Sequence, residues 1–147
     1  MKKAILYTDG ACSNNPGMGG WAYILRFNRK TTENSGFEAE TTNNKMELMA
    51  VIKGLEAIPE KCNVEVYSDS AYVVNAFLED WISTWKKRKW RNSEGKPVKN
   101  LELWQRLVEL SEFHKIKWYK VAGHSDDKLN DRCDKLAKAE VLSHKEN

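Results

Sequence analysis

Short apolar segments separated by turn-forming residues open this chain, and they predict strands. Residues 3–8 (KAILYT) form the first such segment, and a turn-rich stretch over 13–20 follows it. A more polar strand near 33–40 would close a three-stranded meander. Between them, a second strand places its larger apolar side chains on one face, namely Trp21, Tyr23, Leu25 and Phe27, with Ala22 and Ile24 on the other.

From residue 44 the apolar positions follow a helical period instead. Leu48, Val51 and Leu55 mark one face of a helix that ends near Ile58. Strands first and then alternating strands and helices are typical of a mixed sheet with helices packed on it, an α/β fold. The later elements are a strand over 63–67, a helix over 70–78, a helix around 103–110, a strand over 116–121 and a last helix around 129–137.

Length and composition narrow the class of protein. The chain has 147 residues, 41% of them hydrophobic, which favours a single domain over 1–147. Its apolar runs are too short to cross a membrane or to form a signal peptide. Three cysteines, Cys12, Cys62 and Cys133, lack zinc-site spacing and indicate free thiols in a cytoplasmic protein. Nothing indicates an exposed apolar interface, so we expect a monomer with no membrane partner.

Positive charge is concentrated in one segment. Residues 81–100 carry seven basic side chains against the single acidic Glu94, a net charge of +6. Because the whole chain carries +3, the remaining residues carry −3. A basic segment on a slightly acidic body predicts a polyanionic partner contacted at one place.

Four acidic residues stand in positions that burial and periodicity do not explain well. Each also has an ordinary structural explanation when it is taken singly. These are an Asp-Gly turn for Asp9, a capping box with Asn44 for Glu47, a helix N-cap for Asp69, and an i,i+4 ion pair with Lys138 for Asp134.

Considered together, these residues indicate a cation site. In a mixed sheet the first strand and the strand after the first long helix tend to be neighbours, which would bring Asp69 close to Asp9. The start of that helix can bring Glu47 to the same place. Carboxylates crowded together repel one another unless a cation neutralises them. Oxygen ligands without His or Cys favour Mg²⁺ or Mn²⁺.

Five segments of the chain resemble type 1 ribonuclease H, over nearly the whole length from about Ile5 to Ala139. They are YTDGACSNNPGMGG, TTNNKMELMA, YSDSAYV, VAGHSDDKLNDRCDKLA and the pair WISTWKKRKW and KPVKNLELWQRL, which is similar to the basic handle of the bacterial enzymes, here at about 81–100. The resemblance implies a ribonuclease H-like fold, with a five-stranded mixed sheet whose first three strands are antiparallel and helices on both faces.

The resemblance also implies an activity, the endonucleolytic hydrolysis of the RNA strand of RNA–DNA hybrids to 3′-hydroxyl and 5′-phosphate ends. It implies catalysis by two Mg²⁺ ions, with Mn²⁺ as a substitute, and Asp9 bridging both ions. Asp9, Glu47, Asp69 and Asp134 match the family's metal-binding carboxylates, and His124 matches its loop histidine. A histidine there can exchange protons near neutral pH, although an exposed loop histidine without a function is the alternative.

Candidate substrate contacts follow from the same match. The minor-groove set near the 2′-hydroxyl would be Cys12, Asn15, Asn43 and Asn44, with Thr42 at a DNA phosphate. For this set the alternative is turn and helix-cap chemistry. For the handle residues, the alternatives are core packing of the tryptophans and a solvated face for the basic side chains. The handle set would be Trp81, Trp85, Lys86, Lys87, Arg88, Lys89 and Trp90.

Some features leave room for other interpretations. Ala71 stands where the bacterial pattern often has Gln, and Thr84 where Asn is common, which affects affinity rather than the reaction. Another metal nuclease of the same broad fold and a non-catalytic hybrid-binding module are the alternative functions. His114 and His144 have no motif around them and are expected at the surface.

Overall fold

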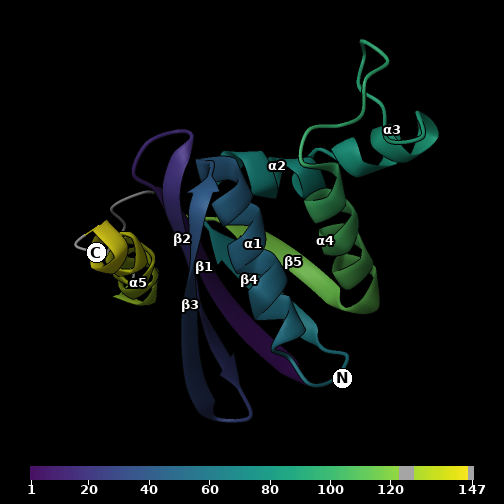
Figure 1. Ribbon diagram of the computed structural model, residues 1–147. Coiled ribbons are helices and arrows are strands. Elements are labelled where there is room, and N and C mark those ends of the chain that lie inside the picture. The colour runs from purple at the N-terminus through teal and green to yellow at the C-terminus, as the bar shows by residue number, and fades with distance from the viewer. Residues whose placement is uncertain (123–127, 146–147) are drawn as a thin grey trace.

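Five strands and five helices make up the part of the chain that the computed structural model describes, residues 1–122 and 128–145 (Figure 1). All five strands belong to one sheet. Their bounds are β1 Lys3–Cys12, β2 Gly17–Phe27, β3 Lys30–Thr41, β4 Asn63–Ser68 and β5 Lys115–Lys120.

The sheet is mixed, in the order β3-β2-β1-β4-β5. β2 pairs antiparallel with both β1 and β3, whereas β4 runs parallel to β1 and β5 parallel to β4. β1 and β4 are therefore central neighbours, and their carboxyl ends lie at the same edge. Tyr7 of β1 lies beside Tyr67 of β4, and Asp9 and Asp69 each come two residues later in the sequence. The two aspartates are therefore at matching positions. This confirms the expected mixed sheet and the expected adjacency of the two strands.

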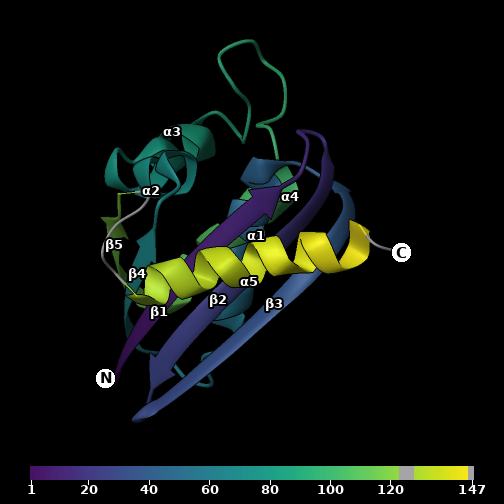
Figure 2. The ribbon, with the colours of Figure 1, turned by 90° about the vertical axis from the view of Figure 1, so that its left-hand side faces the viewer.

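Helices cover both faces of the sheet, as expected. α1 and α4 pack on one face, and α5 lies across β1, β2 and β3 on the other (Figure 2). α2 and α3 lie beyond the end of β4, where the basic segment projects from the body (Figure 1). The bounds are α1 Asn43–Glu56, α2 Ala71–Leu78, α3 Trp81–Lys87, α4 Leu101–Phe113 and α5 Lys128–Lys145.

The main core lies between the sheet and the α1 and α4 layer. Leu6 of β1, Val66 of β4, Leu48 of α1 and Leu107 of α4 are all fully buried there. These residues are the inward positions of the alternating strands and helical stripes in the sequence. Burial of their apolar surface holds the strand ends and helix starts that carry the acidic residues in a fixed arrangement.

Several sequence expectations are shifted by the structure. The strand expected over 3–8 continues to Cys12, and β2 begins at Gly17, inside the stretch expected to be a loop. His114 is buried, 4% exposed, and its Nδ1 accepts a hydrogen bond of 3.1 Å from the backbone N–H of Cys62. The expectation of a surface histidine was wrong there because the residue ends α4 against the core, whereas His144 is exposed as expected.

Two further observations concern the cysteines and the helices. Cys12, Cys62 and Cys133 are free thiols, as expected from the sequence. Within residues 1–122 and 128–145, every helix is too short or too polar to cross a lipid bilayer.

Candidate metal centre and nucleic-acid interface

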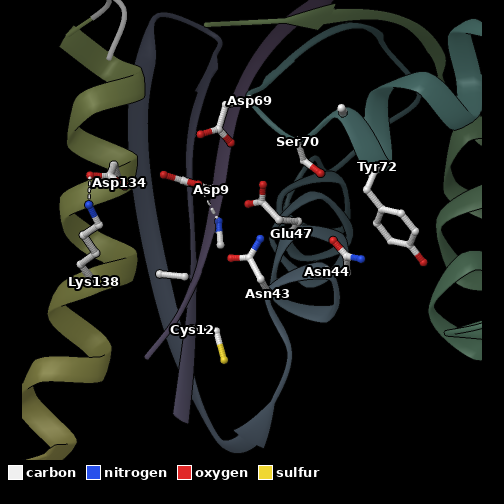
Figure 3. Close-up of a pocket in the computed structure, with 13 residues that line it drawn as sticks. Asp9, Cys12, Asn43, Asn44, Glu47, Asp69, Ser70, Tyr72, Asp134 and Lys138 are labelled. Carbon is white, nitrogen blue, oxygen red and sulfur yellow. Dashed lines mark hydrogen bonds and ion pairs between the residues drawn. The ribbon is translucent and has the colours of Figure 1, made fainter. Parts of the chain in front are cut away.

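Three carboxylates from three separate elements meet at one end of the sheet. Asp9 comes from β1, Glu47 from the second turn of α1, and Asp69 directly follows the end of β4. One oxygen from each lies within 4.8 Å of the others. In Figure 3 these three side chains point into a common space. The structure therefore brings together the first three of the predicted metal ligands.

Close packing of β1 against α1 makes this arrangement possible. Gly10, directly after Asp9, lies so close to α1 that an added Cβ would be 2.5 Å from the backbone N of Glu47 and from the backbone C of Met46. Only a residue without a side chain fits against helix backbone at that distance. The Asp-Gly pair within β1 thus allows the helix to approach the strand closely. The Asp-Gly turn was the wrong explanation for it, since β1 continues to Cys12.

Burial dominates the electrostatics of this cluster. Asp9 and Glu47 are each only 4% exposed. Burial, followed by the neighbouring carboxylate of Asp69, raises the pKa of Asp9 to about 8. Burial, followed by Asp9 and Asp69, also raises the pKa of Glu47 well above its usual range. Oε1 of Glu47 is buried without a hydrogen-bond partner among the described residues. A cation would relieve both the repulsion and the unpaired oxygen, so the donor set fits a hard divalent ion.

Asp134 approaches the same space from α5 on the opposite side (Figure 3). Its carboxylate interacts with Asp9, but it lies outside the three-carboxylate group. Oδ2 of Asp134 is 3.0 Å from Nζ of Lys138, one turn along the helix. The ion pair that the sequence allowed is therefore present, and it coexists with the predicted position of Asp134 beside the cluster.

The helix caps decide two of the structural alternatives. The N-cap of α1 is Thr42, whose hydroxyl accepts a hydrogen bond from the N–H of Lys45. The capping box proposed between Asn44 and Glu47 is therefore absent. The N-cap of α2 is Ser70, whose hydroxyl accepts from the N–H of Val73, so Asp69 does not cap the helix either. Both carboxylates are left for another role.

A cavity of about 460 Å³ surrounds the carboxylates. Cys12, Asn43 and Asn44, which were predicted to contact substrate, line it. Sequence reasoning missed Tyr72, which also lines the cavity, and whose hydroxyl accepts hydrogen bonds from Asn100 Nδ2 at 3.1 Å and Trp104 Nε1 at 2.9 Å. Its position in the first turn of the helix after Asp69 was the available signal.

The other predicted contacts lie around the cavity rather than in it. Asn15 Oδ1 accepts from the backbone N–H of Asn43 at 3.3 Å, which links the β1–β2 loop to the start of α1. Thr42 has its cap role. The cap therefore belongs to Thr42 and not to Asn44, and the contact of Asn15 with Asn43 joins two segments that are distant in the sequence. His124 lies outside the described residues.

The basic segment projects from the body of the protein but packs against it through its tryptophans (Figure 1). α3 carries Trp81 and Trp85, whose ring centroids are 6.3 Å apart, and Trp85 packs edge-on against Trp104 of α4 at 5.1 Å. Trp90 stacks obliquely on Trp85. All three tryptophans of the segment are half-buried, so they anchor it to the body and keep some surface exposed. Of the four consecutive cations, Lys86 pairs with Glu112, and Lys87, Arg88 and Lys89 are exposed.

Comparison with known proteins gives the relationship of the chain. The sequence model of the RNase H family matches residues 1–142. The chain belongs to the ribonuclease H family. The ribonuclease H of Acetivibrio thermocellus is 57% identical over 141 residues, 96% of each chain. That of Chlorobaculum parvum is 50% identical over 142 residues, 96% of this chain and 97% of its own length.

A solved ribonuclease H has the same fold. LC9-RNase H1, described as a type 1 RNase H with the type 2 active-site motif, superposes with a TM-score of 0.83 at 28% identity. The match covers 94% of this chain and 71% of that one. The resemblance drawn from the five sequence segments is thereby confirmed for both family and fold.

Proposed function

We propose that this protein is a metal-dependent endonuclease that hydrolyses the RNA strand of RNA–DNA hybrids and leaves 3′-hydroxyl and 5′-phosphate ends. One observation carries the proposal. In a chain of the ribonuclease H family, Asp9, Glu47 and Asp69 place oxygens within 4.8 Å of one another, and an oxygen of Glu47 is buried and unpaired. Such a cluster costs stability unless it binds a cation, so it is best explained as a metal site, and in this family a metal site serves hydrolysis.

Mg²⁺ is the cofactor that we propose, as two ions with Mn²⁺ as a substitute, because the donors are all carboxylates. Such a metal pair supplies an activated water and neutralises charge on the leaving 3′-oxygen. Asp9 interacts with each of the other three carboxyl groups, which supports a central position contacting both ions. Glu47 and Asp69 would complete the ligand shells, and Asp134 would hold the ion on the side of the attacking water.

His124 is proposed to move protons at the attacking water or at the leaving group. Asp69 and Asp134 are only half-buried and the cavity between them is open to solvent, so a proton-transferring group can reach the carboxylates from outside. The neutral imidazole can accept a proton near pH 7 and return it in a later step.

The amides at the start of α1 are proposed to read the RNA strand. Asn43 and Asn44 line the same cavity as the carboxylates, and the residues from Gly10 to Cys12 line it beside them. A 2′-hydroxyl is the group that distinguishes RNA from DNA, and amides can both donate to it and accept from it. Asn15, which holds the backbone of Asn43, is proposed to belong to the same minor-groove set, and Thr42 is proposed to hold a phosphate of the DNA strand. The exposed cations and tryptophans of the basic segment would contact the DNA strand.

Location, assembly and extent are part of the same proposal. Three free thiols support the cytoplasm. The large exposed apolar side chains in residues 1–122 and 128–145 are scattered over different elements, which supports a monomer. The match of the family over residues 1–142 supports a single ribonuclease H domain with its handle at about 81–100.

Cleavage of a labelled RNA–DNA hybrid, with Mg²⁺ and with EDTA, tests the activity. Asp9→Asn keeps the side-chain shape and removes the central charge. We expect a loss of roughly 10³-fold in rate, since several kcal/mol of transition-state stabilisation depend on the metal. Double-stranded RNA and DNA of the same sequence distinguish a ribonuclease H from another metal nuclease. Full cleavage by Asp9→Asn, or none by the wild type in Mg²⁺, would contradict the proposal.

A further inference from the structure

Lys138 is a cation that already occupies the edge of the carboxylate cluster. Its Nζ is 3.0 Å from Oδ2 of Asp134, and its side chain lines the same cavity as Asp9 and Asp69 (Figure 3). Asp134, then Asp9 and Asp69, raise the pKa of the Lys138 amine, so the ammonium interacts with three of the four carboxylates. Among the described residues, Lys138 is the only basic residue that lines this cavity.

An ammonium and a divalent ion are alternative partners for the same carboxylate. The i,i+4 geometry on α5 turns Asp134 along its helix towards Lys138, and Asp134 lies outside the group formed by the other three carboxylates (Figure 3). A metal ion that is to be shared between Asp9 and Asp134 competes with this ammonium for the negative charge of Asp134, even if it binds the other carboxylate oxygen. It also has to bind beside a fixed positive charge, which repels it.

We propose that Lys138 is a positioning residue that competes with the divalent cation for Asp134. In the metal-free protein it neutralises part of the cluster's charge and holds Asp134 ready beside the site. When the metal binds, Lys138 yields its partner, so its presence weakens metal binding and raises the metal concentration that the enzyme needs. This inference rests on the proposed function, because it takes the four carboxylates to be the metal site.

The size of the effect follows from the exposure of the pair. The side chains of Lys138 and Asp134 are 60% and 43% exposed, so solvent screens their attraction. An ion pair of this kind changes an equilibrium by about two- to fivefold. The direction of the effect on metal binding distinguishes this role from that of an ordinary surface ion pair. Removal of Lys138 should tighten metal binding and should destabilise the metal-free fold, whereas an ordinary surface pair would affect stability alone.

Binding of Mn²⁺ without nucleic acid measures the competition directly. The full-length protein is titrated with MnCl₂ at constant ionic strength, and free Mn²⁺ is followed by its electron paramagnetic resonance signal. Lys138→Gln removes the competing charge, and Lys138→Arg keeps it. Lys135→Gln is the matched control, because Lys135 is exposed on the same helix, carries the same charge and forms no ion pair in the described part of the chain. Any contact between Lys138 and a substrate phosphate does not enter this measurement.

We expect Lys138→Gln to bind Mn²⁺ about two- to fivefold more tightly than the wild type. Lys138→Arg should bind as the wild type does, and Lys135→Gln should show a smaller change. In EDTA, the melting temperature of Lys138→Gln should fall below that of Lys135→Gln. Unchanged or weaker binding by Lys138→Gln, with normal binding by the wild type, would overturn the inference and leave the proposed function standing. If the wild type and Asp9→Asn bind Mn²⁺ equally, the proposed function itself fails, and the inference with it.

Discussion

Glu47 shows how a single residue trades stability for chemistry. It lies on the buried side of α1, two turns before Gly54, where an apolar residue would suit the helix. Its carboxyl group is instead enclosed with two other acids, and one oxygen finds no donor among the described residues. A buried unpaired polar atom typically costs about 1–3 kcal/mol. The folded core elsewhere has to compensate for that cost in the absence of metal.

Replacement of Glu47 by Gln should therefore stabilise the metal-free protein. The Gln side chain has nearly the same shape, carries no charge, and its Nε2 can donate to the carboxylate of Asp9 or Asp69. We expect a gain of about 1–3 kcal/mol in the free energy of unfolding, measured in EDTA at pH 7.5. Cleavage activity and stabilisation by Mg²⁺ should be lost together. Glu38→Gln, at an exposed position of β3, is the control and should change neither property.

The pH dependence of that gain has a definite sign. The pKa of Glu47 is raised in the folded protein, so the folded state retains its proton to higher pH than the unfolded state does. Such a group contributes most favourably below its ordinary pKa of 4.5, and its contribution declines as the pH rises above that value. The advantage of Glu47→Gln should thus be small near pH 4.5 and grow towards pH 7.5. A constant difference across that range would show that charge is not the cause.

At the scale of elements, periodicity located the strands and helices but not all of their ends. Gly17 and Gly19 lie in a stretch that resembles a loop, yet both pair with β3 as part of β2. Glycine occupies these positions because neighbouring atoms lie too close for a side chain. A Cβ on Gly19 would lie 2.4 Å from Cγ2 of Thr41. The same holds for the site. Local patterns placed Asp69 correctly after its strand and predicted the i,i+4 pair of Asp134 and Lys138, but Asp9 lies within β1, and the position of that pair beside the cluster depends on how α5 crosses the sheet.

Close contact between β1 and α1 is the element-level device that assembles the site. Gly10→Ala would place a methyl group against the backbone of α1, which cannot move away without shifting Glu47 from Asp9. We expect cleavage to fall by roughly 10²-fold or more, since misplacement of catalytic groups by about 1 Å has effects of this size. Mn²⁺ binding should weaken in parallel, which a titration without substrate measures.

Gly54→Ala is the matched comparison on the same pair of elements. A Cβ there would meet the Cδ1 atom of Leu6 at 2.5 Å, a side chain deep in the core and far along α1 from the carboxylates. Overpacking should lower the free energy of unfolding by about 1–3 kcal/mol. Cleavage at a temperature where the variant is folded should stay near the wild-type rate. Equal losses of activity in the two variants would mean that general instability, and not the position of Glu47, explains Gly10→Ala.

Across the whole molecule, charge is divided between an acidic site and a basic projection. α2 begins directly after Ser70, beside Asp69, and leads into α3, so the projecting segment lies at the same end of the sheet as the carboxylates (Figure 1). The segment over 81–100 carries +6 in a chain of +3. A duplex that reaches the carboxylates with one strand can thus meet the exposed cations with the other, and binding there should release counterions.

Hybrid affinity should accordingly depend on salt through the basic segment. In the Asp9→Asn background, where the hybrid is not cut, the combined change of Lys87, Arg88 and Lys89 to Ala should weaken binding and reduce the slope of log Kd against log salt. The slope should fall by roughly one for each phosphate that the variant no longer neutralises. Combined replacement of Lys30, Lys115 and Lys117 by Ala removes the same charge from exposed positions on β3 and β5. If both triple variants lower the slope equally, net charge alone governs binding. A larger decrease for the handle variant assigns the phosphate-binding positions to α3 and the turn after it, where the half-buried tryptophans hold the cations in place.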